Sequence, residues 1–409
     1  MPLLPPIEPL TRLQIIYRVT AGMVCMLAAI GLVRYAYGPL LPAMLHANWM
    51  NPPSAAYIAG ANFGANLLAA MVCARLARRW TAGRIVRWGL ILGVISLVAD
   101  AFPLGVWWIG LCRALAGCTA AATMVLIPVI VVRGINPKYR GTVVGLLMTG
   151  AGLGVILASL MLPLAIKPGP RDGWLLLGAV TLLCTLFAWR LLRPLHGSIE
   201  TANPVPISQR ARLVLILMLA GYVMFAVCFV PHSVFLSAYL HKDLGVSPSA
   251  AAMAFVSYGI GLSIGGPILS GMLARKIGLR IGVMVSIILG ITAIAIVLVT
   301  KDVALVVASG CLLGMAQMGI IAIGSVCCLE FAGPTGHAVW WGRFAAGLSL
   351  GVTAGTLIMG AMLSAGFGFI DGFKMASGFG VVSLILIVFV IFIRVSPLGQ
   401  SKTAEAGAS

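Results

Sequence analysis

Residues 105–132 read GVWWIGLCRALAGCTAAATMVLIPVIVV, an apolar run whose only charged side chain is Arg113. About 20 predominantly apolar residues in a helix are enough to cross the hydrocarbon core of a bilayer. A run of this length with a single charge is therefore expected to form a transmembrane helix. Runs of the same kind recur along the whole chain, and they decide its fold class.

The composition indicates that the rest of the chain also lies largely in a lipid bilayer. Of its 409 residues, 61% are hydrophobic and 9% are charged, whereas a soluble globular protein carries about 25% charged residues. Lys and Arg number 27 against 9 Asp and Glu, but they stand in short clusters between apolar runs, which is typical of membrane proteins. We therefore expect no nucleic-acid partner. The N-terminus lacks a basic segment followed by a short apolar core, so we expect no cleavable signal peptide.

Twelve apolar runs are long enough to cross the membrane, which predicts an all-α membrane protein with twelve transmembrane helices. The nine cysteines fall inside these runs, so we expect packing residues and no disulfide framework. The predicted spans are 14–45, 54–78, 83–102, 105–132, 139–166, 173–193, 212–240, 249–274, 280–300, 303–329, 337–366 and 373–394.

The basic residues orient these spans. With both termini cytoplasmic, the cytoplasmic segments hold 20 Lys and Arg and the outer connections hold five, which is the bias seen in inner-membrane proteins. The longest polar connection predicts a cytoplasmic linker at 194–211. It separates an N-terminal six-helix bundle, 1–193, from a C-terminal bundle with a short cytoplasmic tail, 212–409.

The two halves repeat each other. At a shift of 197 residues, Gly150 falls on Gly347, and Leu76-Ala-Arg-Arg falls on Leu273-Ala-Arg-Lys. The constancy of this shift across several spans predicts two six-helix repeats in the same orientation.

Two parallel six-span repeats joined by a cytoplasmic linker resemble the major facilitator superfamily (MFS) over the whole chain. Arg113-Ala-Leu-Ala-Gly in the fourth span is similar to its Arg-x-x-x-Gly motif. The opening Gly31-Leu-Val-Arg34-Tyr35-Ala-Tyr37-Gly-Pro-Leu-Leu-Pro resembles that of the YbfB-like bacterial permeases. The resemblance implies two six-helix bundles with spans 1, 4, 7 and 10 around a central cavity.

Basic residues after spans 2 and 8 resemble the superfamily's loop motif and are candidates for gating. Its usual acidic position is not filled in the first copy, and a basic residue occupies it in the second. The candidate gating residues are Arg78, Arg79, Arg275, Lys276 and Arg280.

Two arginines, Arg34 and Arg113, lie well inside spans 1 and 4. A charge at the bilayer centre costs about 2.5–3.5 kcal/mol on insertion scales, so such residues usually face a cavity or a partner. Asp100, near the outer end of span 3, is the only carboxylate expected to approach them. At least one guanidinium is therefore left for a substrate anion, unless both arginines cap backbone carbonyls or brace the packing of spans 1 and 4.

Uncharged polar side chains complete the candidate substrate site. Each has an alternative as a packing or interfacial residue, because amides join helices as often as they touch ligands. These candidates are Tyr35, Tyr37, Asn62, Asn66, Tyr258 and Gln317.

In span 7, Met224, Cys228 and His232 are spaced four residues apart and share one helical face. Soft ligands of this kind suit copper(I), although Met and Cys are also ordinary packing residues. His232 is in addition a candidate for substrate binding and, with Asp100, for proton coupling. We expect no resident metal and no cofactor.

No nucleotide-binding or hydrolase motif appears in a suitable context, so we expect a transporter and not an enzyme. The leading hypothesis is a secondary transporter that moves a small organic anion, such as a carboxylate, by alternating access. The alternatives are a drug or metabolite exporter for neutral or cationic solutes, a copper or other soft-metal importer, and a non-transporting receptor. The expected partners are the solute, the lipid bilayer and protons as candidate coupling ions, and the expected state is a monomer.

Overall fold

The computed structural model describes residues 11–76, 79–132, 135, 137–166, 169–192 and 207–393. Throughout these residues the regular structure is helical, and twelve helical stretches are long and apolar enough to cross a membrane. The predicted fold class is confirmed. The expected linker at 194–211 falls largely outside the described residues, which resume at 207.

The first six spans consist of eight helices. Span 1 is α1 (Arg12–Met26), η1 (Leu27–Arg34) and α2 (Tyr37–His46), and the others are α3 (Pro52–Leu76), α4 (Ala82–Asp100), α5 (Val106–Val132), α6 (Pro137–Ala165) and α7 (Pro170–Leu192).

The second six spans are more interrupted. Span 7 is α8 (Gln209–Cys228), η2 (Pro231–Phe235) and α9 (Leu236–Lys242), and span 8 is α10 (Pro248–Met253), α11 (Phe255–Gly265), η3 (Gly266–Leu273) and α12 (Ala274–Ile277). The remaining helices are α13 (Leu279–Val299), α14 (Val303–Ser364) and α15 (Phe369–Phe392). α14 contains spans 10 and 11, which are divided at Gly333, where φ is 68°, a conformation that favours glycine.

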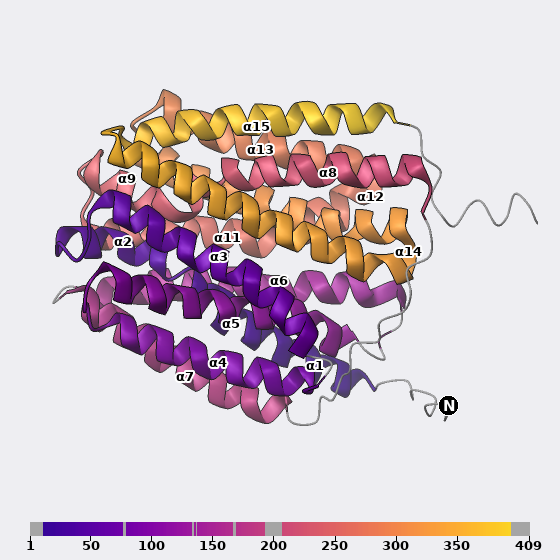
Figure 1. The fold of residues 1–409 in the computed structure, drawn as a ribbon, viewed down its shortest axis with the longest axis horizontal. Coiled ribbons are helices and arrows are strands. Elements are labelled where there is room, and N and C mark those ends of the chain that lie inside the picture. Colours follow the sequence, from indigo (N-terminus) through magenta and orange to yellow (C-terminus); the bar gives the residue numbers. More distant parts are fainter. Residues whose placement is uncertain are drawn as a thin grey trace, which may run out of the picture.

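Each half packs chiefly within itself, and the two halves lie side by side (Figure 1). In the first bundle α5 packs against α3 and α4, and in the second α8 packs against α14 and α15. Gly150 of α6 lies against Met23 of α1, and Gly347 of α14 lies against Leu219 of α8. These two glycines, matched by the repeat, therefore face corresponding spans.

Two seams join the bundles, α3 against α14 and α6 against α11. Small residues bring the backbones close at both. A Cβ added to Gly152 would lie 2.3 Å from Ser263 Oγ, and one added to Gly60 would lie 3.1 Å from Thr356 Oγ1. Interfaces between transmembrane helices commonly use such small residues, because close packing replaces the missing hydrophobic drive.

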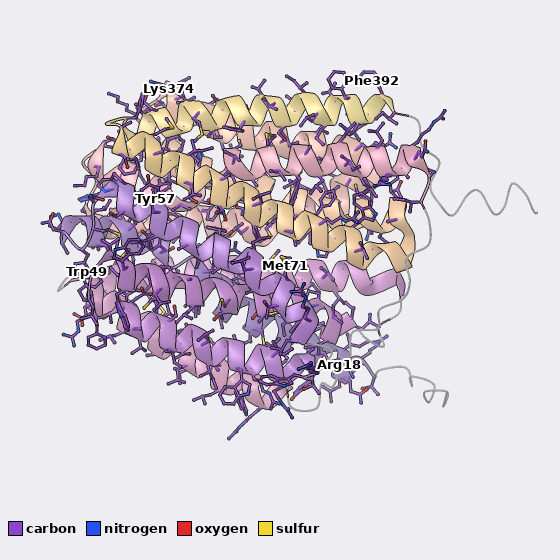
Figure 2. All side chains as sticks on the ribbon, in the orientation of Figure 1. Arg18, Trp49, Tyr57, Met71, Lys374 and Phe392 are labelled. Atoms are coloured by element: carbon purple, nitrogen blue, oxygen red, sulfur yellow. The ribbon has the colours of Figure 1, made fainter. Side chains whose placement is uncertain are left out.

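The two ends of the molecule differ. Arg18 of the first span and Phe392 of the last lie toward one end, whereas Trp49 and Lys374 lie toward the other (Figure 2). At the latter, α2 packs on α9 and α10. There Ser237 Oγ donates a hydrogen bond of 2.5 Å to the Gly38 carbonyl. The two bundles therefore also contact each other at the α2–α9 end.

Candidate functional site

Two small cavities lie between the bundles and share Arg34, Tyr35 and Phe63 in their walls. The space open to the centre of a water molecule is about 30 Å³ in the larger cavity and about 20 Å³ in the smaller. One water needs roughly 10–15 Å³ on this measure. In this conformation the cavities therefore have room for very few waters, and an organic solute requires the walls to move apart.

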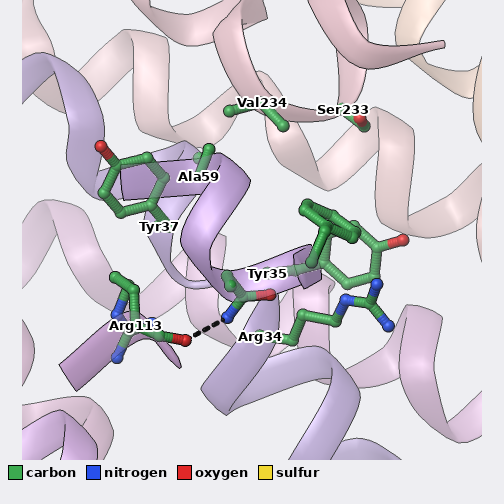
Figure 3. Close-up of a pocket in the computed structure, with 10 residues that line it drawn as sticks. Arg34, Tyr35, Tyr37, Ala59, Arg113, Ser233 and Val234 are labelled. Carbon is green, nitrogen blue, oxygen red and sulfur yellow. Dashed lines mark hydrogen bonds between the residues drawn. The ribbon is translucent and has the colours of Figure 1, made fainter. Parts of the chain in front are cut away.

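Arg34 is the last residue of η1, a π-helical segment inside span 1. Segments of this kind occur frequently at functional sites, since the wide turn redirects the side chains that follow. Arg34 is only 7% exposed and lines both cavities. Arg34, the deeply buried cation of span 1, therefore lies at the space between the bundles (Figure 3).

Among the described residues, the Arg34 guanidinium has no carboxylate partner. Within the part of the chain that the structure describes, no hydrogen-bond acceptor or carboxylate pairs with it, and its Nε is buried without a partner. Its Cζ lies 4.2 Å from the centroid of the Phe63 ring. A cation–π contact offsets part of the desolvation of a cation but supplies no negative charge.

Three of the predicted polar residues meet beside Arg34. Gln317 Nε2 donates a hydrogen bond of 3.0 Å to the Tyr35 hydroxyl, and the Tyr258 hydroxyl donates to Gln317 Oε1. These residues belong to spans 10, 1 and 8, so this hydrogen-bonded chain links the two bundles. It gives the wall of the larger cavity a small polar patch.

Arg113 is equally buried, and its Nε likewise has no partner among the described residues, but the protein supplies its counter-charge. It forms an ion pair with Asp100, and it donates hydrogen bonds of 2.9 Å to the Val33 carbonyl and 3.1 Å to Ser96 Oγ. Its guanidinium also lies over the Trp174 ring at 4.6 Å. Arg113 lines the smaller cavity, but together with Asp100 it carries no net charge there.

Asn62 and Asn66 join span 2 to span 4. Asn62 Nδ2 donates to the Arg113 carbonyl at 2.8 Å (Figure 3), and Asn66 Nδ2 donates to the Gly117 carbonyl at 3.1 Å. Asn66 also accepts a hydrogen bond from Ser349 of α14. The amides therefore hold helices together, while Asn62 additionally lines the smaller cavity.

Tyr37 also has a structural bond while facing the smaller cavity. Its hydroxyl donates to the Ala55 carbonyl at 2.8 Å, which ties span 1 to the start of span 2. Tyr37 is thus a lining residue whose polar atom already has a protein partner.

The span 7 residues Met224, Cys228 and His232 lie on the side of the helix that faces the interior of the second bundle. His232 Nε2 lies 2.9 Å from Ser309 Oγ, and its ring packs against Phe373 at 5.1 Å. Cys228 points toward Gly380 of α15, and Met224 is half-buried. None of these three lines either cavity. Over the described residues, no three His, Cys, Asp or Glu side chains gather as metal ligands.

Four of the five candidate gating residues lie among the described residues. Arg78 is outside the described residues, and Arg79, Arg275 and Lys276 are exposed. Arg280 Nη1 donates to the carbonyls of Val390 and Ile393, at 3.2 and 2.5 Å. It therefore caps the end of α15, where a cation complements the helix dipole.

Sequence reasoning missed Phe63, Ser96 and Trp174, which surround the two arginines. Aromatic side chains such as Phe63 and Trp174, or a single serine such as Ser96, are ordinary in apolar runs and give no signal of their own. Their roles emerge only from contacts between spans.

Comparisons with known proteins agree with the geometry. The model of a family described as "Uncharacterised MFS-type transporter YbfB" matches residues 26–391. Among solved structures, the nucleoside transporter NupG has a TM-score of 0.72 at 15% identity, over 91% of this chain and 99% of that one.

A bacterial homologue of the human lysosomal transporter Spinster gives TM-scores of 0.68 and 0.69 in its unoccupied and occupied inward-facing conformations. Both are 14% identical over 93% of this chain and 96% of that one. No curated protein matches the sequence.

Proposed function

Because the chain belongs to the family of MFS-type transporters described by YbfB, we propose that it is a secondary transporter of a small organic anion, such as a carboxylate. The proposal assigns Arg34 as the residue that binds the anionic group. Tyr35 and Gln317, which line the same cavity, are assigned as its hydrogen-bonding neighbours.

The observation that carries the proposal is the unpaired state of Arg34. A buried guanidinium is expensive in a membrane unless an anion accompanies it. Arg113 has Asp100 for this purpose, whereas among the described residues Arg34 has a contact with the Phe63 ring but no carboxylate partner. A solute carboxylate supplies what is missing, and a guanidinium presents the planar fork that binds a carboxylate bidentately.

The position of Arg34 suits alternating access. It lies at the boundary of the bundles, below the contact of α2 with α9 and α10. In the proposed cycle the bundles rock against each other along the α3–α14 and α6–α11 seams, and the solute is reached from one side at a time.

We propose a bacterial inner membrane as the location, with both termini cytoplasmic, on the distribution of Lys and Arg between the connections. The α2–α9 end then faces outward. For proton coupling, Asp100 is the better candidate of the two, since its partner Arg113 lines a cavity and His232 lines neither.

The test is solute binding and uptake by the purified protein in nanodiscs and proteoliposomes, with organic anions, cations and neutral solutes of similar size. We expect anions to bind best. Replacing Arg34 by Gln removes charged hydrogen bonds worth about 1.5–3 kcal/mol each and should weaken anion binding ten- to hundredfold.

Arg34→Lys should fail nearly as badly, because an ammonium does not reproduce the fork. The matched control is Arg84→Gln, which removes an exposed arginine on α4 and should bind normally. Preferred binding of cations or neutral solutes, or normal anion binding by both Arg34 variants, would contradict the proposal and favour the exporter alternative.

A further inference from the structure

We infer that the transported anion carries a single charge on an otherwise apolar body, an inference that rests on the proposed function. Three features of the cavities support it: their net charge, the chemistry of the larger wall, and the distribution of polar groups around Arg34.

The charge of the lining favours a monoanion. Among the described residues that line the two cavities, the charged ones are Arg34 and Arg113. Arg113 is neutralised by Asp100, so one positive charge remains. A monoanion would cancel it, whereas a dianion would leave an uncompensated negative charge in a poorly solvated site, which is costly.

The larger cavity is apolar and adaptable. Met26, Met124, Met148 and Met318 contribute to it from spans 1, 4, 5 and 10. Methionine is flexible and polarizable, so it adjusts to apolar groups of different shapes. Apolar surface of this kind favours a hydrocarbon body and penalises hydroxyl groups, which would lose their water without gaining hydrogen bonds.

Polar groups other than Arg34 are few in that wall. Besides the arginine, the larger cavity has only Tyr35 and Gln317 as polar side chains, and these two are hydrogen-bonded to each other. A polyhydroxylated solute would find few free partners here. A single anionic group needs only the guanidinium.

The two cavities, which share Arg34, differ in the polarity of their lining residues. The smaller one contains Tyr37, Asn62, Arg113 and Ser233, whereas the larger one is lined mainly by Met, Ile, Leu, Val and Phe. The anionic group is therefore assigned to Arg34 at the boundary, with the apolar body in the larger cavity.

The experiment compares four probes of related size with protein in nanodiscs: cyclohexanecarboxylate, its neutral amide, gluconate and succinate. We expect cyclohexanecarboxylate to bind at least tenfold more tightly than gluconate or succinate, because each buried methylene favours binding. The amide should bind weakly, since it lacks the charge.

Variants at Met148 test the wall itself. Met148→Gln places an amide in the apolar cavity and should weaken cyclohexanecarboxylate binding about tenfold. Met148→Leu keeps an apolar side chain of similar volume and should stay within about threefold of the original protein.

The outcomes separate this inference from the proposed function. If gluconate or succinate binds as tightly as cyclohexanecarboxylate, in an Arg34-dependent manner, the protein is an anion transporter but the inference is wrong. The inference is also wrong if the Met148→Gln variant binds cyclohexanecarboxylate as tightly as the Met148→Leu variant does. If the amide binds as well as the acid and Arg34→Gln changes nothing, the proposed function itself fails.

Discussion

Arg34 and Arg113 lie in the same bundle, both almost completely buried, yet their surroundings are opposite. Arg113 meets a carboxylate, two further acceptors and a tryptophan ring, while Arg34 meets a phenylalanine ring. A buried cation that the protein neutralises itself strengthens the packing. One that it leaves without an anion remains available to a ligand.

The largest expected effect comes from breaking the neutralised pair. Asp100→Ala should destabilise the protein by about 3–5 kcal/mol, because it leaves Arg113 as an uncompensated buried charge. The measurement is the free energy of unfolding in detergent. Lys374→Ala is the control, since its ion pair with Asp371 is exposed and should contribute less than about 1 kcal/mol. Equal effects of the two changes would remove the contrast between Arg113 and Arg34.

Arg34→Gln should shift stability in the opposite direction. Without solute, removing an unpaired buried charge should raise the free energy of unfolding, by about 1 kcal/mol or more. Functional sites commonly trade stability for activity in this way. Thermal unfolding without and with a bound organic anion tests the point, and the anion should stabilise the original protein more than the variant. A variant less stable than the original protein without solute would mean that Arg34 is a packing residue.

The smallest effect concerns one acceptor of Arg113. Ser96→Ala deletes the hydroxyl that accepts from Arg113 and donates to the Cys112 carbonyl, and it should cost about 1 kcal/mol. The ion pair with Asp100 remains, so anion binding should be nearly unchanged. A loss of binding comparable to that of Arg34→Gln would show that the Arg113 cluster also controls the solute site.

The fold was predictable because the length of each apolar run can be counted directly in the sequence. Twelve long runs, a polar connection near the middle and a repeat at a nearly constant shift were sufficient for two six-helix bundles. Interruptions within spans were not predicted. The π-helical segments Leu27–Arg34 and Pro231–Phe235 depend on packing against neighbouring spans and leave no pattern in hydropathy.

The candidate site was predictable in its charges and less so in its contacts. Counting acids singled out Asp100 as the only possible partner, and the structure pairs it with Arg113. The sequence could not say which arginine would take it. Nor could it show that Tyr35, Tyr258 and Gln317 form one hydrogen-bonded chain, because these residues come from three spans in two bundles.

The glycine-lined seams between the bundles bear on how fast the protein could isomerise. Side chains that interlock across an interface must be unlocked before the interface slides, and this raises the barrier to movement. At Gly152 and Gly60 the helices instead approach each other closely and leave little room for a larger side chain. A larger side chain at either position would push the helices apart or interlock with the facing helix. A larger side chain at either glycine should therefore slow the proposed rocking movement, whereas loss of a contact at the end, such as that of Ser237 with Gly38, should change which conformation is populated.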